Sequence, residues 1–161
     1  MPLLVNLRHL ERRNVLLEGE LPVSELDLDT RDEMLRANLP LAHDLEVQLL
    51  DESLLIRGSL RLTLDCQCVR CLKPFKHRLE LTDWTCHLPL KGEERVPVVS
   101  DCVDLTPHIR EDILLAIPAH PVCDAKCAGL AGAISGAKKN KGPSQTKSSA
   151  SAWSPLDKLK L

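Results

Sequence analysis

The sequence predicts an α+β fold, in which an antiparallel β-meander carries one packed helix and is followed by a disordered, basic C-terminal tail. Strict alternation of apolar and polar residues in LLIRGSLRLTLDC, residues 54–66, predicts a half-buried strand. Apolar residues at three- to four-residue spacing in residues 105–117 predict a helix. We expect these elements to form a single domain over residues 1–130. A Gly/Ser/Ala/Lys-rich linker (131–152), which cannot bury a core, and a short docking motif (153–161) follow it.

Residues 45–90 are predicted to form the three strands of the meander. A short turn at Asp51-Glu52-Ser53 connects the first two strands, and Gly58 on the inner face of the second marks a bulge or a close backbone approach. The third strand changes parity, so a bulge at Thr82-Asp83 must absorb the slip. The loop before it is CQCVRCLKP, residues 66–74. A fourth strand is predicted from alternation at Val15, Leu17, Gly19 and Leu21.

The predicted helix has recognisable ends. Asp104 or Thr106 can cap its start, Pro107 is tolerated in the first turn, and Pro118 stops it. Its length is about three turns, which is typical of globular proteins. Packed on the sheet, this helix would complete an α+β domain.

Composition and charge narrow the class of protein. With one Phe, two Trp and no Tyr in 161 residues, the core must be aliphatic. No apolar run approaches the roughly 20 residues of a membrane helix, and no secretion signal is evident, so we expect a cytoplasmic protein without membrane contact. Residues 128–161 carry six lysines and one acid, whereas the preceding 127 residues carry 15 basic and 22 acidic residues. A basic tail on an acidic body favours contact with a polyanion, although solvation alone would also explain it.

The seven cysteines include two short pairs, Cys68-Val-Arg-Cys71 and Cys123-Asp-Ala-Lys-Cys127. Two such pairs, separated by a long insertion, can form a tetrahedral zinc site. Idle thiols are the alternative. A redox dithiol is disfavoured, because the first pair lies between antiparallel strands rather than at a helix N-terminus. Zinc, held by Cys68, Cys71, Cys123 and Cys127, is the candidate cofactor, and idle thiols stay the alternative.

Positive charge gathers on the hairpin around the first cysteine pair. Residues 57–78 contain six basic residues and one acid: Arg57, Arg61, Arg70, Lys73, Lys76 and Arg78 against Asp65. Such a face could contact RNA phosphates, and a strand face kept soluble by charge is the alternative. Few aromatics are available to stack on bases. Glycine-rich phosphate loops, nucleophile elbows and zinc-protease helices are missing from the sequence, so we expect neither catalysis nor a small-molecule substrate.

Three segments, in this order, resemble one family. CVRCLKPF (68–75) resembles the C-x-x-C-x-x-P-F hairpin of the YceD family, the large-ribosomal-RNA-subunit accumulation proteins. EDILLAIPAHP (111–121) is similar to that family's acidic-aliphatic helix, and WSPLDKLKL (153–161) resembles its C-terminal aromatic-Pro, Leu and Lys signature. No single motif is specific, but the ordered set is, and the likeness covers most of residues 10–161.

The resemblance implies a non-enzymatic factor, bacterial or organellar, that is needed for large-subunit (23S) rRNA to accumulate. The implied partners are precursor rRNA or an assembling large subunit, and a ribosomal protein is a further candidate. Cys68 and Cys71 correspond to the two cysteines of the family's C-x-x-C-x-x-P-F motif. In many members the second group continues as C-x-G-L-C-x-x-C-G, whereas here Ala131 stands where the next cysteine would be. The alternative function is a zinc- or thiol-containing protein-interaction module without direct RNA contact.

Overall fold

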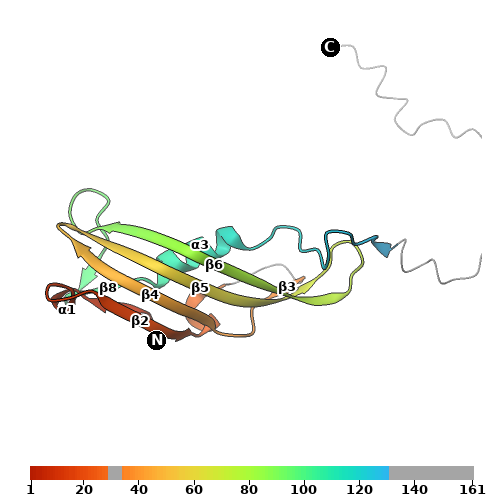
Figure 1. Cartoon of the computed structure of the whole chain (residues 1–161), viewed down its shortest axis with the longest axis horizontal. Helices are drawn as coiled ribbons and strands as arrows, with labels where there is room; N and C mark the ends of the chain where they lie inside the picture. The colour runs from red at the N-terminus through yellow and green to blue at the C-terminus, as the bar shows by residue number, and fades with distance from the viewer. Residues whose placement is uncertain (29–33, 131–161) are drawn as a thin grey trace, which may run out of the picture.

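Long strands from the middle of the chain dominate the computed structural model, which describes residues 1–28 and 34–130 (Figure 1). In chain order the elements are β1 (Leu4–Asn6), α1 (Leu7–Leu10), β2 (Val15–Leu21), α2 (Val23–Leu26), β3 (Leu35–Arg36), β4 (Leu41–Leu50), β5 (Ser53–Gln67), β6 (Pro74–Pro89), β7 (Val98–Val99), β8 (Cys102–Asp104) and α3 (Thr106–Ala116). In the main sheet β2 pairs with β4 and β4 with β5, while β3 and β6 also pair with β5. All of these pairings are antiparallel, which confirms the predicted α+β class.

The meander of β4, β5 and β6 forms as predicted. A two-residue turn, Asp51-Glu52, joins β4 to β5. Between β5 and β6 the register shifts just after Gly58, so that Ser59 alone lies opposite two residues, Thr82-Asp83. This is the predicted bulge, and it returns Trp84 to the buried face after the change of parity. The predicted fourth strand is β2, which pairs with β4.

Gly58 lies where β4 and β5 approach closely. A Cβ atom at this position would lie 2.0 Å from the backbone oxygen of Asp44 and 2.8 Å from Cα of Leu45. Both distances are far shorter than van der Waals contact. The position therefore requires glycine, and the predicted close backbone approach at Gly58 is confirmed.

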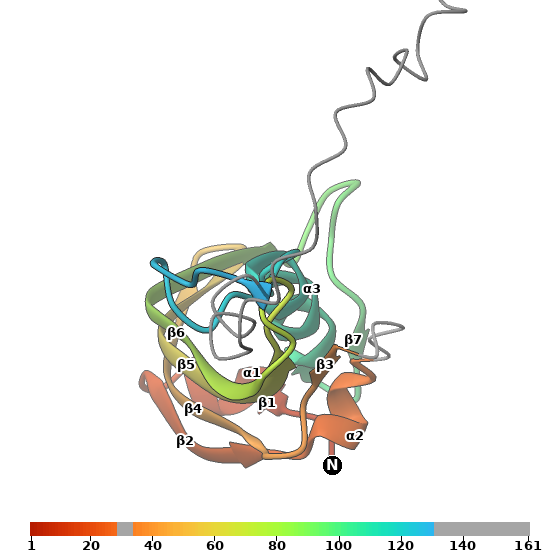
Figure 2. The ribbon, with the colours of Figure 1, turned by 90° about the vertical axis from the view of Figure 1, so that its right-hand side faces the viewer.

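Helix α3 lies in the concavity of the curled main sheet (Figure 2). Its apolar side chains Ile109 and Ile113 are fully buried. On the opposite side of the packing interface, Trp84 Nε1 of β6 donates a hydrogen bond to Asp112 Oδ2 at 2.6 Å. The helix thus packs on the sheet as predicted, and one charge-assisted hydrogen bond fixes its position beside β6.

The start of α3 differs in detail from the prediction. Leu105 occupies the N-cap position, and its side chain makes no capping bond. The carboxylate of Asp104 accepts the backbone N–H of Thr106 at 2.9 Å, while the Thr106 hydroxyl accepts the N–H of Leu3 at 2.9 Å. Asp104 therefore satisfies one of the orphan donors of the first turn, and Thr106 fastens the start of the chain.

A small second sheet, with strand order β1-β8-β7, was not predicted. Its strands have only two or three residues, which is too short for a period-two pattern to appear in the sequence. The pairing of β1 with β8 brings the start of the chain next to α3.

The core is aliphatic, as the composition predicted. In the described part of the chain, Trp84 is the only buried aromatic side chain among leucines, isoleucines and valines. None of the helices in residues 1–28 and 34–130 is long and apolar enough to cross a bilayer. The disordered linker (131–152) and docking motif (153–161) lie outside the described residues and stay predictions.

Candidate metal centre and basic hairpin

The turn between β5 and β6, residues 68–73, meets the segment that follows α3. The backbone N–H of Val69 donates to the oxygen of Pro121 at 2.9 Å, which joins the two segments directly. Within the turn, the N–H of Cys68 bonds to the oxygen of Lys73, and the N–H of Leu72 bonds back to Cys68, each at 2.9 Å. Two parts of the chain separated by some 50 residues therefore form one end of the molecule.

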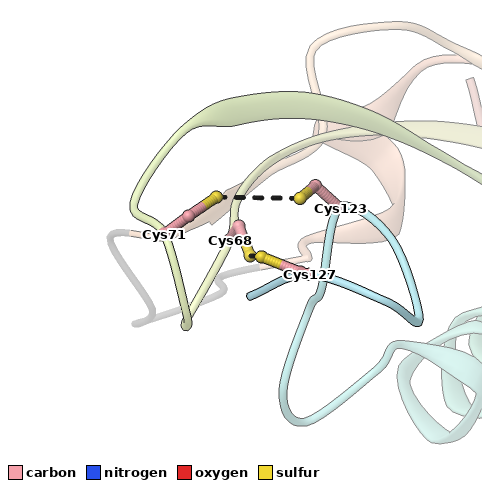
Figure 3. Close-up of side chains that lie close together, drawn as sticks. All are labelled: Cys68, Cys71, Cys123 and Cys127. Carbon is pink, nitrogen blue, oxygen red and sulfur yellow. Dashed lines mark hydrogen bonds between the residues drawn. The ribbon is translucent and has the colours of Figure 1, made fainter. Parts of the chain in front are cut away.

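Four cysteine sulfurs converge at this end (Figure 3). The Sγ atoms of Cys68 and Cys127 are 3.8 Å apart, and those of Cys71 and Cys123 are 3.7 Å apart. All four lie within 4.8 Å of one another. These distances are well beyond a disulfide bond of about 2.05 Å. The four cysteines are free thiols in a cluster that could hold a metal ion.

The sulfur geometry fits a tetrahedral ion. At a Zn–S distance of about 2.3 Å, a regular tetrahedron places its sulfurs about 3.8 Å apart. The two short sulfur pairs match this edge length, and each joins one cysteine of the turn to one cysteine after α3. Four thiolates in a tetrahedron select zinc or iron rather than magnesium or calcium. The predicted ligand set is therefore brought together by the fold.

The surroundings of Cys68 favour the thiolate form, which is the form that binds a metal cation. Backbone hydrogen bonds from Cys123, Cys71 and Arg70 lower the pKa of the Cys68 thiol to about 6, although burial opposes them. Hydrogen bonding with the other thiols, Cys71 first, raises the pKa of Cys123 to about 12. The cluster thus favours a thiolate at Cys68, and a bound cation would favour thiolates at all four positions.

The segment after α3 is held beside the cluster by contacts that the sequence did not predict. Asp124 Oδ1 accepts the N–H of Lys126 at 2.9 Å, and this turn presents Cys127. Gly129 has a φ of +71°, and a Cβ there would lie 3.4 Å from the Arg70 backbone oxygen. The Arg70 guanidinium in turn donates to the Cys127 oxygen at 3.4 Å. The Cys-Ala-Gly-Leu stretch was the available signal for a tight backbone position at Gly129.

The other three cysteines lie away from the cluster. Cys66 is buried on the inner face of β5, as its parity predicted. Cys86 is half-buried on β6, where burial, with smaller effects of Asp112 and Glu111, raises the pKa of its thiol to about 11. Cys102 belongs to β8. In the described residues, only the four predicted cysteines form a metal-sized group of His, Cys, Asp or Glu ligands.

The six basic residues of the hairpin are all exposed, and we call them the basic hairpin: Arg57, Arg61, Arg70, Lys73, Lys76 and Arg78. Four of them point outward from β5 and β6, whereas Arg70 and Lys73 belong to the turn beside the cysteine cluster. Arg61 and Arg78 line the same surface hollow. This exposure agrees with a basic face of the hairpin that is open to solvent.

Acidic residues are interleaved with the bases along the strands. In the sheet register, Arg57 lies opposite Glu46 of β4, and Arg61 lies opposite Glu80 of β6. Lys76 forms an exposed ion pair with Asp65 at 3.7 Å, which contributes little to stability. Within residues 1–28 and 34–130, the other five members of the basic hairpin form no ion pair. Arg70 and Lys73 of the turn, together with Arg78, which pairs with Thr63, therefore have no acid opposite them in the strand register.

The fold and the cluster define an antiparallel α+β protein with a four-cysteine centre at the tip of a long hairpin. A family model described as "Large ribosomal RNA subunit accumulation protein YceD" matches residues 56–160, well over half of the chain. The chain therefore belongs to the YceD family. The matched range includes most of β5, all of β6, the cysteine cluster and α3.

Similarity to individual proteins is weaker. Uncharacterized proteins of Mycobacterium tuberculosis and Mycobacterium bovis are each 28% identical to this chain over 95 residues. The alignment covers 54% of this chain and 46% of each relative, so the chain matches about half the length of these proteins. No solved structure matches the chain.

Proposed function

We propose that this protein is a non-enzymatic factor for the accumulation of large-subunit (23S) rRNA, and that it binds precursor rRNA or the assembling large subunit through the basic hairpin. Membership of the YceD family carries the biological role, because the family description names accumulation of this RNA. The basic hairpin supplies the chemistry, since exposed arginines and lysines neutralise phosphates and release counterions. Action in the cytoplasm, where ribosomes assemble, is part of the proposal.

The turn is the strongest candidate for the first contact. Arg70 and Lys73 are exposed there, and both belong to the segment that the cysteine cluster holds in place. On the strands, Glu46, Glu80 and Asp65 reduce the local positive charge. We infer that the turn meets phosphate directly and that the strand arginines extend the contact.

Zinc is the proposed cofactor, held by Cys68, Cys71, Cys123 and Cys127. Its role would be structural: four protein ligands close the coordination sphere and leave no open position for a substrate. Bound zinc would lock the turn onto the segment after α3, so Arg70 and Lys73 would be presented by an ordered backbone. This ordering lowers the entropic cost of binding a rigid RNA surface.

The test measures binding to large-subunit rRNA fragments as a function of salt concentration. The Arg70→Glu/Lys73→Glu variant should bind more weakly, and its dependence of log affinity on log salt should flatten by about 0.7 to 0.9 per lost phosphate contact. The matched control is Lys91→Glu/Arg95→Glu, which makes the same charge change beyond the other end of β6.

An equal loss of RNA affinity in both double variants would show that the overall charge of the protein, not the turn, governs binding. Unchanged affinity and slope in the Arg70→Glu/Lys73→Glu variant would remove the proposed surface. If the protein still migrated with large-subunit precursors on a sucrose gradient, the protein-interaction alternative would replace direct RNA contact.

A further inference from the structure

A groove with apolar and acidic lining residues lies between β6 and α3. It has a volume of about 650 Å³ and is lined by Leu81 and Trp84 of β6 and by Leu115 and Ala116 of α3. Leu115 is 84% exposed, although the neighbouring Ile113 of the same helix is fully buried. Leu115 adjoins the half-buried Leu81 and Ala116 in the lining of the groove, and contiguous apolar surface of this kind marks contact sites.

The rim of this β6–α3 groove is acidic. Glu80, Asp83 and Asp112 line it, and no basic side chain does. Asp112 is held toward β6 by its hydrogen bond with Trp84. A ligand that fits must therefore combine apolar side chains with positive charge.

The C-terminal segment of the same chain has this chemistry. Residues 153–161, WSPLDKLKL, contain four large apolar residues, two lysines and one acid. The linker before it adds four more lysines and no acid. We propose that residues 153–161 dock in the β6–α3 groove, with Trp153 and the leucines against Leu115 and the lysines facing the acidic rim.

The linker has the length to reach the groove. The described chain ends next to the cysteine cluster, where Gly129 lies against Arg70. From the start of β6 at Pro74 to the bulge at Thr82 the strand advances about 27 Å, at about 3.4 Å per residue. A flexible linker of the length of residues 131–152 has a root-mean-square span of about 26 Å. The effective concentration of the segment at the groove would therefore be near its maximum.

The two tryptophans allow a direct test on the full chain. After incorporation of 5-fluorotryptophan, the fluorine resonance of Trp153 should differ in chemical shift from that of the free amino acid. Its solvent isotope shift, measured on exchange of H₂O for D₂O, should be smaller than that of the free amino acid. A Trp153→Phe variant assigns the two resonances. Leu115→Lys should move Trp153 to the position of the free amino acid with a full solvent shift, and Asp83→Lys should move it part of the way.

Leu16→Lys is the matched control, since Leu16 is 68% exposed on β2 and outside the groove. It should leave the Trp153 resonance unchanged, and all three variants should keep the wild-type melting temperature because the altered side chains are exposed. A fully solvent-exposed Trp153 in the wild-type protein would overturn the proposal. So would a Trp153 shift that survives Leu115→Lys, or one that disappears on dilution and so reports docking on a second copy.

Discussion

At the scale of single residues, Gly58 shows how one missing methyl group allows two long strands to pair. The backbone oxygen of Asp44 occupies the place where a Cβ would be, and the nearest atoms are all backbone of Asp44 and Leu45, so no flexible side chain can move away. The strain must then be absorbed by the strands themselves, which hold many of the buried leucines.

Gly58→Ala should therefore destabilise the protein by about 3 kcal/mol or more, as overpacking against backbone does. Urea unfolding measures this loss. Gly19→Ala is the control, because its Cβ would lie 3.4 Å from the His43 ring, an ordinary contact, and it should change stability by less than about 1 kcal/mol. Equal effects of the two substitutions would contradict the close approach of β4 and β5.

His43 is the buried polar residue of the inner sheet face. Only 8% of its surface is exposed, and Nδ1 has no hydrogen-bond partner among the described residues. Burial lowers the pKa of His43 below 6.5, although the backbone of Leu41 and the charge of Asp44 oppose this. Below pH 6.5 the unfolded chain therefore binds a proton at this histidine more readily than the folded chain. The stability of the fold thus decreases as the pH is lowered.

His43→Leu should remove this part of the acid sensitivity. Both proteins are compared by urea unfolding at pH 7.5 and pH 5.5, and the wild type should lose up to about 1 kcal/mol more than the variant over this interval. At pH 7.5 the neutral ring carries no such penalty. A wild-type loss no greater than that of His43→Leu would show that the ring is protonated equally in both states.

At the scale of elements, the β5–β6 hairpin and the segment after α3 depend on each other. They are joined by the four cysteines, by the backbone hydrogen bond from Val69 to Pro121 and by the Arg70 side chain, which donates to the Cys127 oxygen. The strands of the hairpin, in contrast, pair along their whole length and bury one face in the core. A metal at the cluster should thus order the turn and the segment after α3 without being needed for the sheet.

Removal of the metal should accordingly produce a local change. After chelation, amide hydrogen exchange should become faster in residues 68–73 and 119–130, whereas amides in the middle of β4 and β5 should keep their protection. Hydrogen exchange with mass spectrometry resolves these segments. Uniform acceleration across β4 and β5 would show that the metal supports the whole fold, and no change in residues 68–73 would show that it does not order the turn.

At the scale of the whole molecule, the sequence was most informative where a pattern repeats. Period two over β5 defined the inner face from Leu54 to Cys66, and the parity change required a bulge where Thr82 and Asp83 lie. The second sheet had no such signal, because strands of two or three residues show no period. Helix α3 was predicted from its spacing, but the use of Thr106 to hold the start of the chain depends on a tertiary contact.

The candidate site was predictable in its ligands and less so in its surroundings. Cysteine spacing identified Cys68, Cys71, Cys123 and Cys127, because short pairs present two thiolates from one bend. The acids beside the basic hairpin were visible in the sequence, yet only the strand register shows that Glu46 and Glu80 lie opposite Arg57 and Arg61. Register depends on pairing across the sheet, which one sequence does not specify.

The four-cysteine centre unites these scales, since it joins the hairpin turn to the segment after α3 and so places the proposed RNA-contacting residues. Native mass spectrometry of protein purified without chelator tests it most directly. We predict one zinc per chain, retained in Cys102→Ser and lost in Cys71→Ser. A wild-type protein without bound metal, or a Cys71→Ser variant that keeps its zinc, would contradict the account.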